Sequence, residues 1–418
     1  MSFQIRPLSR SDRLASARLG AEAFGGPSPL RPPPEGEWPP AGHSTWGTFD
    51  GDTLTAQAFR RAYCSWFGGV QVPTNGLAGV TVAAEYRGRG LLGPLIEQVL
   101  ADGRAEGDVI STLFASAPGI YHRFGYALLT SHDVVEIPTA AAAAVRPEDP
   151  ARPAYPAGKV TTRRATPADK VTTRRATPAD LDAIKGLYDQ WAAAQNGPLT
   201  RTGPNFPPVD LTQEFTGVSL ATGPDDRLQG YASWTRGTQE GPKAALTVHD
   251  LIATTPDAYR VLWRLLGSFA PVLGLIRLHT SGADIARSFL PAAAWRTTFT
   301  DPYMLRLDDV AGAFTLRRLR LNDDVSFRVA GDVFGVMDGT YVLTADDDGA
   351  TCQRTGDAGT APPGAPVYTP AGIALAWSGV QSSANIRMAG GLTGGDEATD
   401  AVLDRALGGW QVHVRDAF

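Results

Sequence analysis

The chain has 418 residues, of which 43% are hydrophobic and 19% are charged. This length can hold two or three globular domains with their own cores, and the composition is not that of a disordered chain. The net charge of -5 argues against a nucleic-acid partner, which would require a basic face. No apolar run approaches the roughly 18 residues of a membrane span, and the first residues lack the apolar core of a signal peptide. We therefore expect a cytoplasmic protein without a membrane partner.

The first 135 residues alternate predicted strands and helices. Residues 3–8 are expected to form a strand, and Ser11 and Asp12 to cap a helix that ends near Phe24. The proline-rich segment 26–44 suits a mobile lid or pocket wall. Further strands are expected at 46–50, 53–57, 63–70 and 108–114.

A glycine-rich turn precedes the helix that we expect to end near residue 102. It reads Arg87-Gly88-Arg89-Gly90. Two glycines let successive N–H groups converge, and the helix start adds partial positive charge, so this turn is built for an anion. The alternative is a tight connection only, but a helix start disfavours two arginines unless an anion offsets them. The turn lacks the glycine spacing of a dinucleotide fold and the Gly-Lys-Ser/Thr of a P-loop, which leaves coenzyme A as the leading candidate.

The order Arg87-x-x-Gly90-x-Leu92 resembles the acyl-CoA motif of the GNAT acetyltransferases, usually written Gln/Arg-x-x-Gly-x-Gly/Ala. Its Arg-Gly-Leu-Leu run is similar to the Eis (enhanced intracellular survival) branch. The resemblance implies acetyl-CoA as co-substrate, held by Val80, Val82, Ala83, Arg87, Gly88, Arg89, Gly90, Leu91 and Leu92. In the GNAT fold the strand before this turn splays away from its neighbouring strand, so the resemblance implies that backbone groups near Val82 hold the pantetheine arm. The alternative is that Val82 is only a packing residue of the hydrophobic core.

Two residues are expected to carry the proton transfers. The run from Gly119 to Tyr126 contains two tyrosines. For either of them the alternative is a structural role, as a buried aromatic residue whose hydroxyl is hydrogen-bonded. In Eis enzymes the tyrosine of an Ile-Tyr-x-Arg-Phe-Gly-Tyr run is the general acid, which implies Tyr121. The resemblance also implies that the terminal carboxylate of Phe418 is the base. With a reference pKa of about 3.5 it would act through a water and by attracting the ammonium; a frayed tail is the alternative.

The expected substrate is a primary amine of a small cationic or peptide molecule, with aminoglycosides as one possibility. The acceptor site is expected to be lined by Phe24, Trp38 and Ser116. Relatives that acetylate aminoglycosides line the pocket with acidic residues. At the corresponding places this chain has Ala417, Ala117-Pro118 and Gly25-Gly26 instead. The attraction of cations should therefore be weaker. Cys64 and Cys352 have no metal-ligand spacing and the six histidines do not cluster, so no metal is expected.

Residues 138–170 are predicted to be a linker, which contains an 11-residue segment, 159–169, repeated unchanged as 170–180. We interpret the copy as a local duplication. Only the second copy leads into a helix, which Thr177 should cap. The following domain, 171–311, echoes the first and resembles the inactive second domain of Eis. Its equivalent of the anion turn has Asp257 where a phosphate would dock, so it should not bind coenzyme A.

The last domain, 312–418, is expected to carry strands at 316–321, 325–329 and 341–344 and helices at 369–379 and 399–407. It resembles the sterol-carrier-protein-like third domain of Eis, for which a lipid cavity and a packing or assembly role are both possible. The predicted fold is thus α/β (α+β): a catalytic GNAT domain over 1–137, a degenerate GNAT-like domain and a sterol-carrier-protein-like domain. The resemblance further implies a homo-oligomer, a hexamer. The functional hypotheses are an N-acetyltransferase, a lipid or small-molecule binder, and an inert assembly protein.

Overall fold

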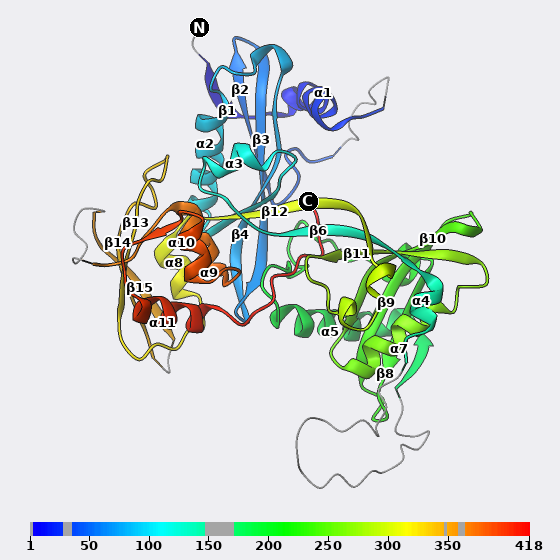
Figure 1. Cartoon of the computed structure of the whole chain (residues 1–418). Coiled ribbons are helices and arrows are strands. Elements are labelled where there is room, and N and C mark those ends of the chain that lie inside the picture. The colour runs from blue at the N-terminus through cyan, green and yellow to red at the C-terminus, as the bar shows by residue number, and fades with distance from the viewer. Residues whose placement is uncertain (1–2, 28–35, 147–170, 347–348, 358–363) are drawn as a thin grey trace.

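Figure 1 shows the computed structural model of the chain, which describes residues 3–27, 36–146, 171–346, 349–357 and 364–418. Within these residues the strands form one sheet of twelve and one of five. The first copy of the repeated segment, 159–169, lies outside the described residues, as does part of the proline-rich segment. No helix in the described ranges has the length and apolar character needed to cross a membrane.

The first domain alternates strands and helices as expected. Its elements are β1 (Gln4–Pro7), α1 (Arg13–Phe24), β2 (His43–Asp50), β3 (Thr53–Phe67), β4 (Val70–Val82), α2 (Leu92–Ala105), β5 (Ile110–Phe114), α3 (Pro118–His122) and β6 (Ala127–Pro138). The strands predicted at 53–57 and 63–70 are in fact one long strand, β3, followed by β4. The first helical turn is capped by Ser9 rather than Ser11, because Asp12 bonds back to the N–H of Ser9 at 2.7 Å.

The middle domain repeats this order. It contains β7 (Thr172–Arg175), α5 (Leu181–Ala193), α6 (Leu211–Glu214), β8 (Gly217–Thr222), β9 (Leu228–Arg236), β10 (Gly241–Ala253), α7 (Pro256–Gly267), β11 (Leu273–Ser281) and β12 (Arg296–Leu307). The second copy of the repeat forms β7 and a turn capped by Thr177. The start of the expected linker is folded: α4 (Thr139–Ala143) packs on α7 so closely that a Cβ on Gly267 would meet the backbone of Ala143.

The two GNAT-like domains exchange their last strands. In the large sheet the order is β1-β2-β3-β4-β5-β12-β6-β11-β10-β9-β8-β7. The middle domain's β12 lies between β5 and β6, and β6 in turn pairs with β11 of the middle domain. Both domains therefore share one continuous sheet, and segments far apart in sequence meet across its centre (Figure 1).

The third domain follows α8 (Val310–Thr315) and packs on the first domain. Its sheet has the order β15-β14-β13-β16-β17 and its bounds are β13 (Val325–Val329), β14 (Gly339–Ala345), β15 (Ala350–Gly356), β16 (Val367–Tyr368), α9 (Pro370–Ser378), α10 (Ser383–Met388), β17 (Leu392–Thr393) and α11 (Glu397–Leu407). The strand predicted at 316–321 was wrong. That segment has the alternation of a strand because Leu319 is buried between exposed Arg318 and Arg320, but it pairs with no described strand.

Candidate functional site

The site begins where β4 and β5 separate. The two parallel strands pair only at Thr74–Gly76 with Ile110–Thr112. A bulge follows in β4, marked by Gly79 with a φ of 60°, where any Cβ would meet the ring of Phe59 at 2.5 Å. From Leu77 to Val82 no described strand pairs with the β5 side of β4, which is the splay that the resemblance implied.

The glycine-rich turn forms an open set of backbone donors at the start of α2. Gly88 and Gly90 both have a φ of 76°, and nothing lies within 4 Å of where their Cβ atoms would be. In the described part of the chain no hydrogen bond takes up the N–H of Gly88, Gly90 or Leu91, and no side chain caps α2. Unsatisfied N–H groups that converge on open space at a helix start are a fit for a pyrophosphate.

Both arginines of the turn donate to backbone carbonyls of residues that precede it. The exposed Arg87 donates to the carbonyl of Val82 at 3.2 Å, so it ties the turn to the end of β4. Arg89 donates to the carbonyl of Glu85 at 3.0 Å and lies over the ring of Tyr86. Val80 and Val82 are half-buried and pack against the core beneath α2, while Ala83 packs against a smaller cluster around Phe49. Leu91 and Leu92 anchor the helix start in the same core as Val80.

The corresponding helix of the middle domain is closed to an anion. Thr255 caps α7 by accepting a hydrogen bond from the N–H of Ala258 at 3.3 Å, and Asp257 lies in the first turn. The donors are partly used and the local charge is negative. Among the described residues, the glycine-rich turn before α2 thus has features of an anion site that the start of α7 lacks.

The two tyrosines near the end of β5 differ in their surroundings. Tyr126 is fully buried and its hydroxyl hydrogen-bonds Ser111 at 2.7 Å. Tyr121, in α3, is half-buried, and no hydrogen-bond partner of its hydroxyl occurs among the described residues. Burial raises the pKa of Tyr121 to about 12, so it keeps its proton at neutral pH. What distinguishes the two tyrosines is therefore the hydroxyl, which bonds Ser111 in Tyr126 and has no bond to a described residue in Tyr121.

The terminal Phe418 lies at the point where β4 and β5 separate. Its ring centre is 4.8 Å from that of Tyr63 on β3 and 5.4 Å from that of Phe114 at the end of β5. On β4, a Cβ added to Gly76 would come within 2.8 Å of the Phe418 ring. A glycine inside a strand marks a close approach, and this was the one sequence signal that could have located the terminus.

The C-terminal tail is ordered along its length. Asn196 holds it from both sides, donating its N–H to the carbonyl of Gln411 and accepting from the N–H of His413, each at 2.8 Å. The side chain of Asn196 in turn bonds the backbones of Gly68 and Ser378, so all three domains meet here. Val412, His413 and Val414 are buried. In Figure 1 the tail leaves α11 and ends beside β12 and β6. These contacts favour a packed tail over the frayed-tail alternative.

A row of imidazoles continues from Phe114 across the sheet. His132 of β6 lies 6.3 Å from Phe114 between ring centres, and His279 of β11 follows at 5.5 Å and His249 of β10 at 5.4 Å. Burial and the neighbouring imidazoles lower the pKa of His279 to about 4. Sequence reasoning missed this row because strand exchange alone brings its members together. Even so, no group of three His, Cys, Asp or Glu in the described ranges could hold a metal ion.

The three predicted acceptor residues lie on separate segments of the first domain. Phe24 is 60% exposed at the end of α1, Trp38 is half-buried near the guanidinium of Arg13, and Ser116 is exposed between β5 and α3. No hydrogen bond or ring contact in the described ranges joins any of them to Tyr121 or Phe418. Their role stays a prediction.

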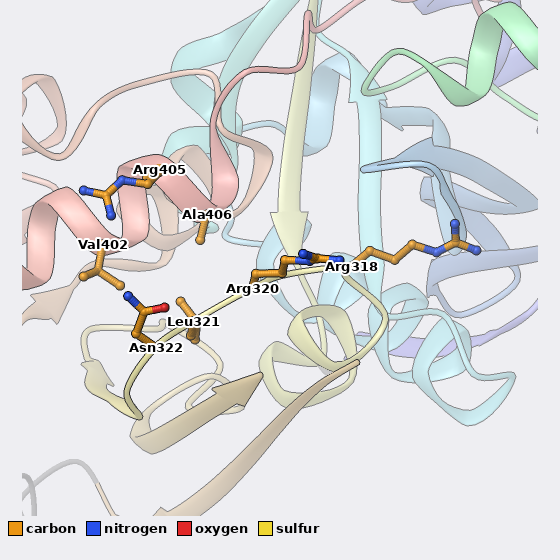
Figure 2. A pocket seen from close by; sticks show the side chains of 7 residues that line it. All are labelled: Arg318, Arg320, Leu321, Asn322, Val402, Arg405 and Ala406. Atoms are coloured by element: carbon orange, nitrogen blue, oxygen red, sulfur yellow. The ribbon is translucent and has the colours of Figure 1, made fainter. Parts of the chain in front are cut away.

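The third domain carries a hollow of about 390 Å³ between α11 and the segment after α8 (Figure 2). Figure 2 shows the guanidinium groups of Arg318 and Arg405 pointing to opposite sides. The wall consists of Arg318, Arg320, Leu321, Asn322, Val402, Arg405 and Ala406. Such a polar wall is unsuited to an acyl chain, so this hollow does not favour the lipid hypothesis.

Comparison with known proteins gives a consistent result. Families described as acetyltransferase (GNAT) domain match residues 4–129 and 197–317. An uncharacterized N-acetyltransferase of Streptomyces coelicolor is 30% identical over 304 residues, which cover 69% of this chain and 68% of that protein.

Solved structures share the whole architecture. A GCN5-related N-acetyltransferase from Anabaena variabilis matches with a TM-score of 0.78 at 18% identity, and Eis1 from Mycobacterium abscessus with 0.71 at 21%, each over 100% of both chains. The predicted fold, with tandem GNAT domains and an Eis-like arrangement, is confirmed.

Proposed function

The chain belongs to the GNAT N-acetyltransferases, and from that premise we propose that it transfers the acetyl group of acetyl-CoA directly to a primary amine. Tyr121 is the general acid and the carboxylate of Phe418 is the base. The observation that carries this assignment is the position of both residues at the end of β5: Phe418 packs on Phe114, and α3 with Tyr121 follows within the next residues.

The first domain fits acetyl-CoA. When bound, acetyl-CoA supplies the acetyl group as a thioester. The N–H groups of Gly88, Gly90 and Leu91, together with Arg87 and the start of α2, would hold the pyrophosphate. The unpaired side of β4 between Leu77 and Val82 would hold the pantetheine arm and orient the thioester carbonyl.

The proton transfers follow from the two residues. An aliphatic amine has a pKa of about 10.4 and is protonated at neutral pH, so it must lose a proton before it attacks. The Phe418 carboxylate attracts the ammonium and takes its proton through a water, since a carboxylate with a reference pKa of about 3.5 is a weak base. Tyr121 retains its proton until the sulfur leaves and then donates it.

The proposed acceptor is the amine of a small cationic or peptide molecule, and an aminoglycoside is one candidate. Ala417, beside the terminal residue, and exposed Ala117 offer no charge to a polycation, which favours acceptors with fewer positive charges. The proposal extends to a homo-oligomer, a hexamer, testable by light scattering. It also places the protein in the cytoplasm, where free Cys64 and Cys352 would stay reduced.

The test is acetyl transfer to a panel of aminoglycosides, polyamines and lysine peptides. Mass spectrometry of the acceptors identifies the product independently of the protein's own thiols, and release of coenzyme A gives the rate. Acetyl-CoA alone is the control for hydrolysis. If acetyl-CoA binds but no amine is acetylated above that control, the proposed function is refuted.

A further inference from the structure

The middle domain retains the strand splay of a GNAT fold after losing its anion site. Its β10 and β11 pair in parallel at Gly241 with Leu273 and at Ala245–Val248 with Leu275–Leu278, and in the described ranges no pairing between them is found beyond Val248 and Leu278. The gap beyond is occupied by the C-terminal tail. The buried Arg415 donates to the carbonyl of His279 on β11 at 2.5 Å and to that of Leu251 on β10 at 3.2 Å. The tail thus fills the slot of the middle domain, whereas in the first domain the β5 side of β4 has no strand partner from Leu77 to Val82 in the described ranges.

A second contact follows one residue later. Arg201 uses both terminal nitrogens to bind Asp250 of β10, at 2.6 and 3.0 Å, and its Nε donates to Asp416 of the tail at 3.0 Å. Asp250 is buried and also accepts from the hydroxyl of Tyr231 at 2.8 Å. The Arg201–Asp250 pair is therefore complete without the tail, and the Nε edge of the guanidinium remains for Asp416.

The backbone of Arg201 is held in an uncommon conformation for this purpose. Its φ is 50°, in the left-handed region that residues other than glycine rarely adopt. The guanidinium lies 4.1 Å from the ring centre of Tyr188, whose hydroxyl donates to the carbonyl of Leu199 at 2.7 Å. Such a conformation persists only where several contacts determine it together, and it clusters at functional sites.

We propose that the middle domain serves as the anchor of the catalytic C-terminus, with Arg201 as a positioning residue that acts through Asp416 on the carboxylate of Phe418. The inference rests on the proposed function, since that carboxylate is the proposed base. Only Ala417 lies between Asp416 and the terminal Phe418, so a change in the anchor moves the carboxylate without touching acetyl-CoA.

The test variant is Asp416→Asn, which removes the negative charge of the Asp416 side chain and leaves the Arg201–Asp250 pair intact. Its matched control is Asp400→Asn in α11, because Asp400 binds Arg387 in a similar pair and is 16% exposed against 19% for Asp416. The first readout does not require activity: carboxypeptidase A digestion, followed by intact mass, measures how fast Phe418 is removed. We expect removal to be about tenfold faster in Asp416→Asn than in wild type or the control, as for the loss of hydrogen bonds to a charged group.

The second readout is turnover against pH. At neutral pH, Asp416→Asn should lose kcat at least about tenfold with the KM for acetyl-CoA unchanged. The loss should shrink near pH 10, because the amine then loses its proton without help. A generally destabilised enzyme would lose rate equally at all pH values. Asp416→Glu, which keeps the charge, should recover part of kcat.

Each outcome has one meaning. Equal rates of Phe418 removal in Asp416→Asn and wild type would overturn the anchor. Faster removal with unchanged turnover would overturn the positioning role. Faster removal in a protein whose wild type acetylates no amine would support the anchor and refute the proposed function instead.

Discussion

Replacing Tyr121 with phenylalanine removes one hydroxyl and little else. The ring contact with Tyr126, at 6.0 Å between centres, does not depend on the hydroxyl. Because no described residue bonds that hydroxyl, the change leaves no buried partner unsatisfied. The free energy of unfolding should therefore stay within about 0.5 kcal/mol of wild type. A positioned general acid contributes roughly 10²–10⁴ in rate, or about 3–5 kcal/mol of barrier.

The assay is the rate of coenzyme A release at saturating acetyl-CoA, with chemical denaturation measured in parallel. Tyr121→Phe should lower kcat by about 10²-fold or more at unchanged KM for acetyl-CoA. Since burial raises the pKa of Tyr121 to about 12, the wild-type rate should rise with pH as the amine loses its proton, with no falling limb from this tyrosine below about pH 11.

Tyr126→Phe is the matched control from the same run of sequence. It breaks the buried bond to Ser111, so it should lower the free energy of unfolding by about 1 kcal/mol and leave kcat within a few fold of wild type. If Tyr126→Phe loses more rate than Tyr121→Phe, the assignment of the acid is wrong.

Three further predictions follow from single features. Gly90→Ala should weaken acetyl-CoA binding, which would appear as a raised KM for acetyl-CoA. Its control is Gly107→Ala, because Gly107 also has a positive φ and open space around it, and the control should raise that KM less. One glycine added after Phe418 should depress kcat but not the melting temperature; an unchanged kcat would remove the carboxylate from the mechanism. The pKa of His279 is lowered to about 4 in the fold, so the unfolded state binds more protons between pH 6.5 and 4 and stability should fall as pH drops through that range. His279→Asn should flatten this dependence in denaturation series.

The anion turn could be predicted from sequence because it is local. Gly88 and Gly90 need a positive φ, and the helix that follows them has the apolar periodicity of a packed helix, so four adjacent residues define the feature. The tyrosine was found by resemblance, and the structure adds the physical distinction from Tyr126 that the sequence lacked. Strand alternation correctly located β13 and β14 in the third domain but also suggested a strand at 316–321, where one buried leucine produces the same pattern.

Features that depend on distant pairing could not be predicted. A strand such as β6 has the same pattern whether it returns to its own domain or crosses to β11, because side-chain alternation reports which face is buried and not which neighbour it has. The neighbouring positions of His132 and His279 follow from that exchange, and the contact of Arg201 with Asp416 depends on where the C-terminal tail packs. In the sequence, Arg201 and Asp416 are 215 positions apart and neither belongs to a motif.

The length of the tail limits where its carboxylate can be. Arg415 bonds the carbonyls of β10 and β11, and Phe418 packs on Phe114 at the end of β5, with β12 and β6 separating β5 from β11. Three strand spacings of about 4.8 Å make about 14 Å. Three extended residues reach only about 10 Å, so the side chains of Arg415 and Phe418 must cover the remainder.

Deleting Ala417 removes about 3.3 Å of reach and reverses the face on which Phe418 points, so the shortened tail should lose either the Arg415 contacts or the packing of Phe418. We therefore expect the deletion to lower kcat as strongly as a residue added after the terminus, while Ala417→Gly, which keeps the length, stays near wild type. Comparable kcat values for the deletion and Ala417→Gly would show that the tail is not stretched between the two splays, and the positioning argument built on its length would fail.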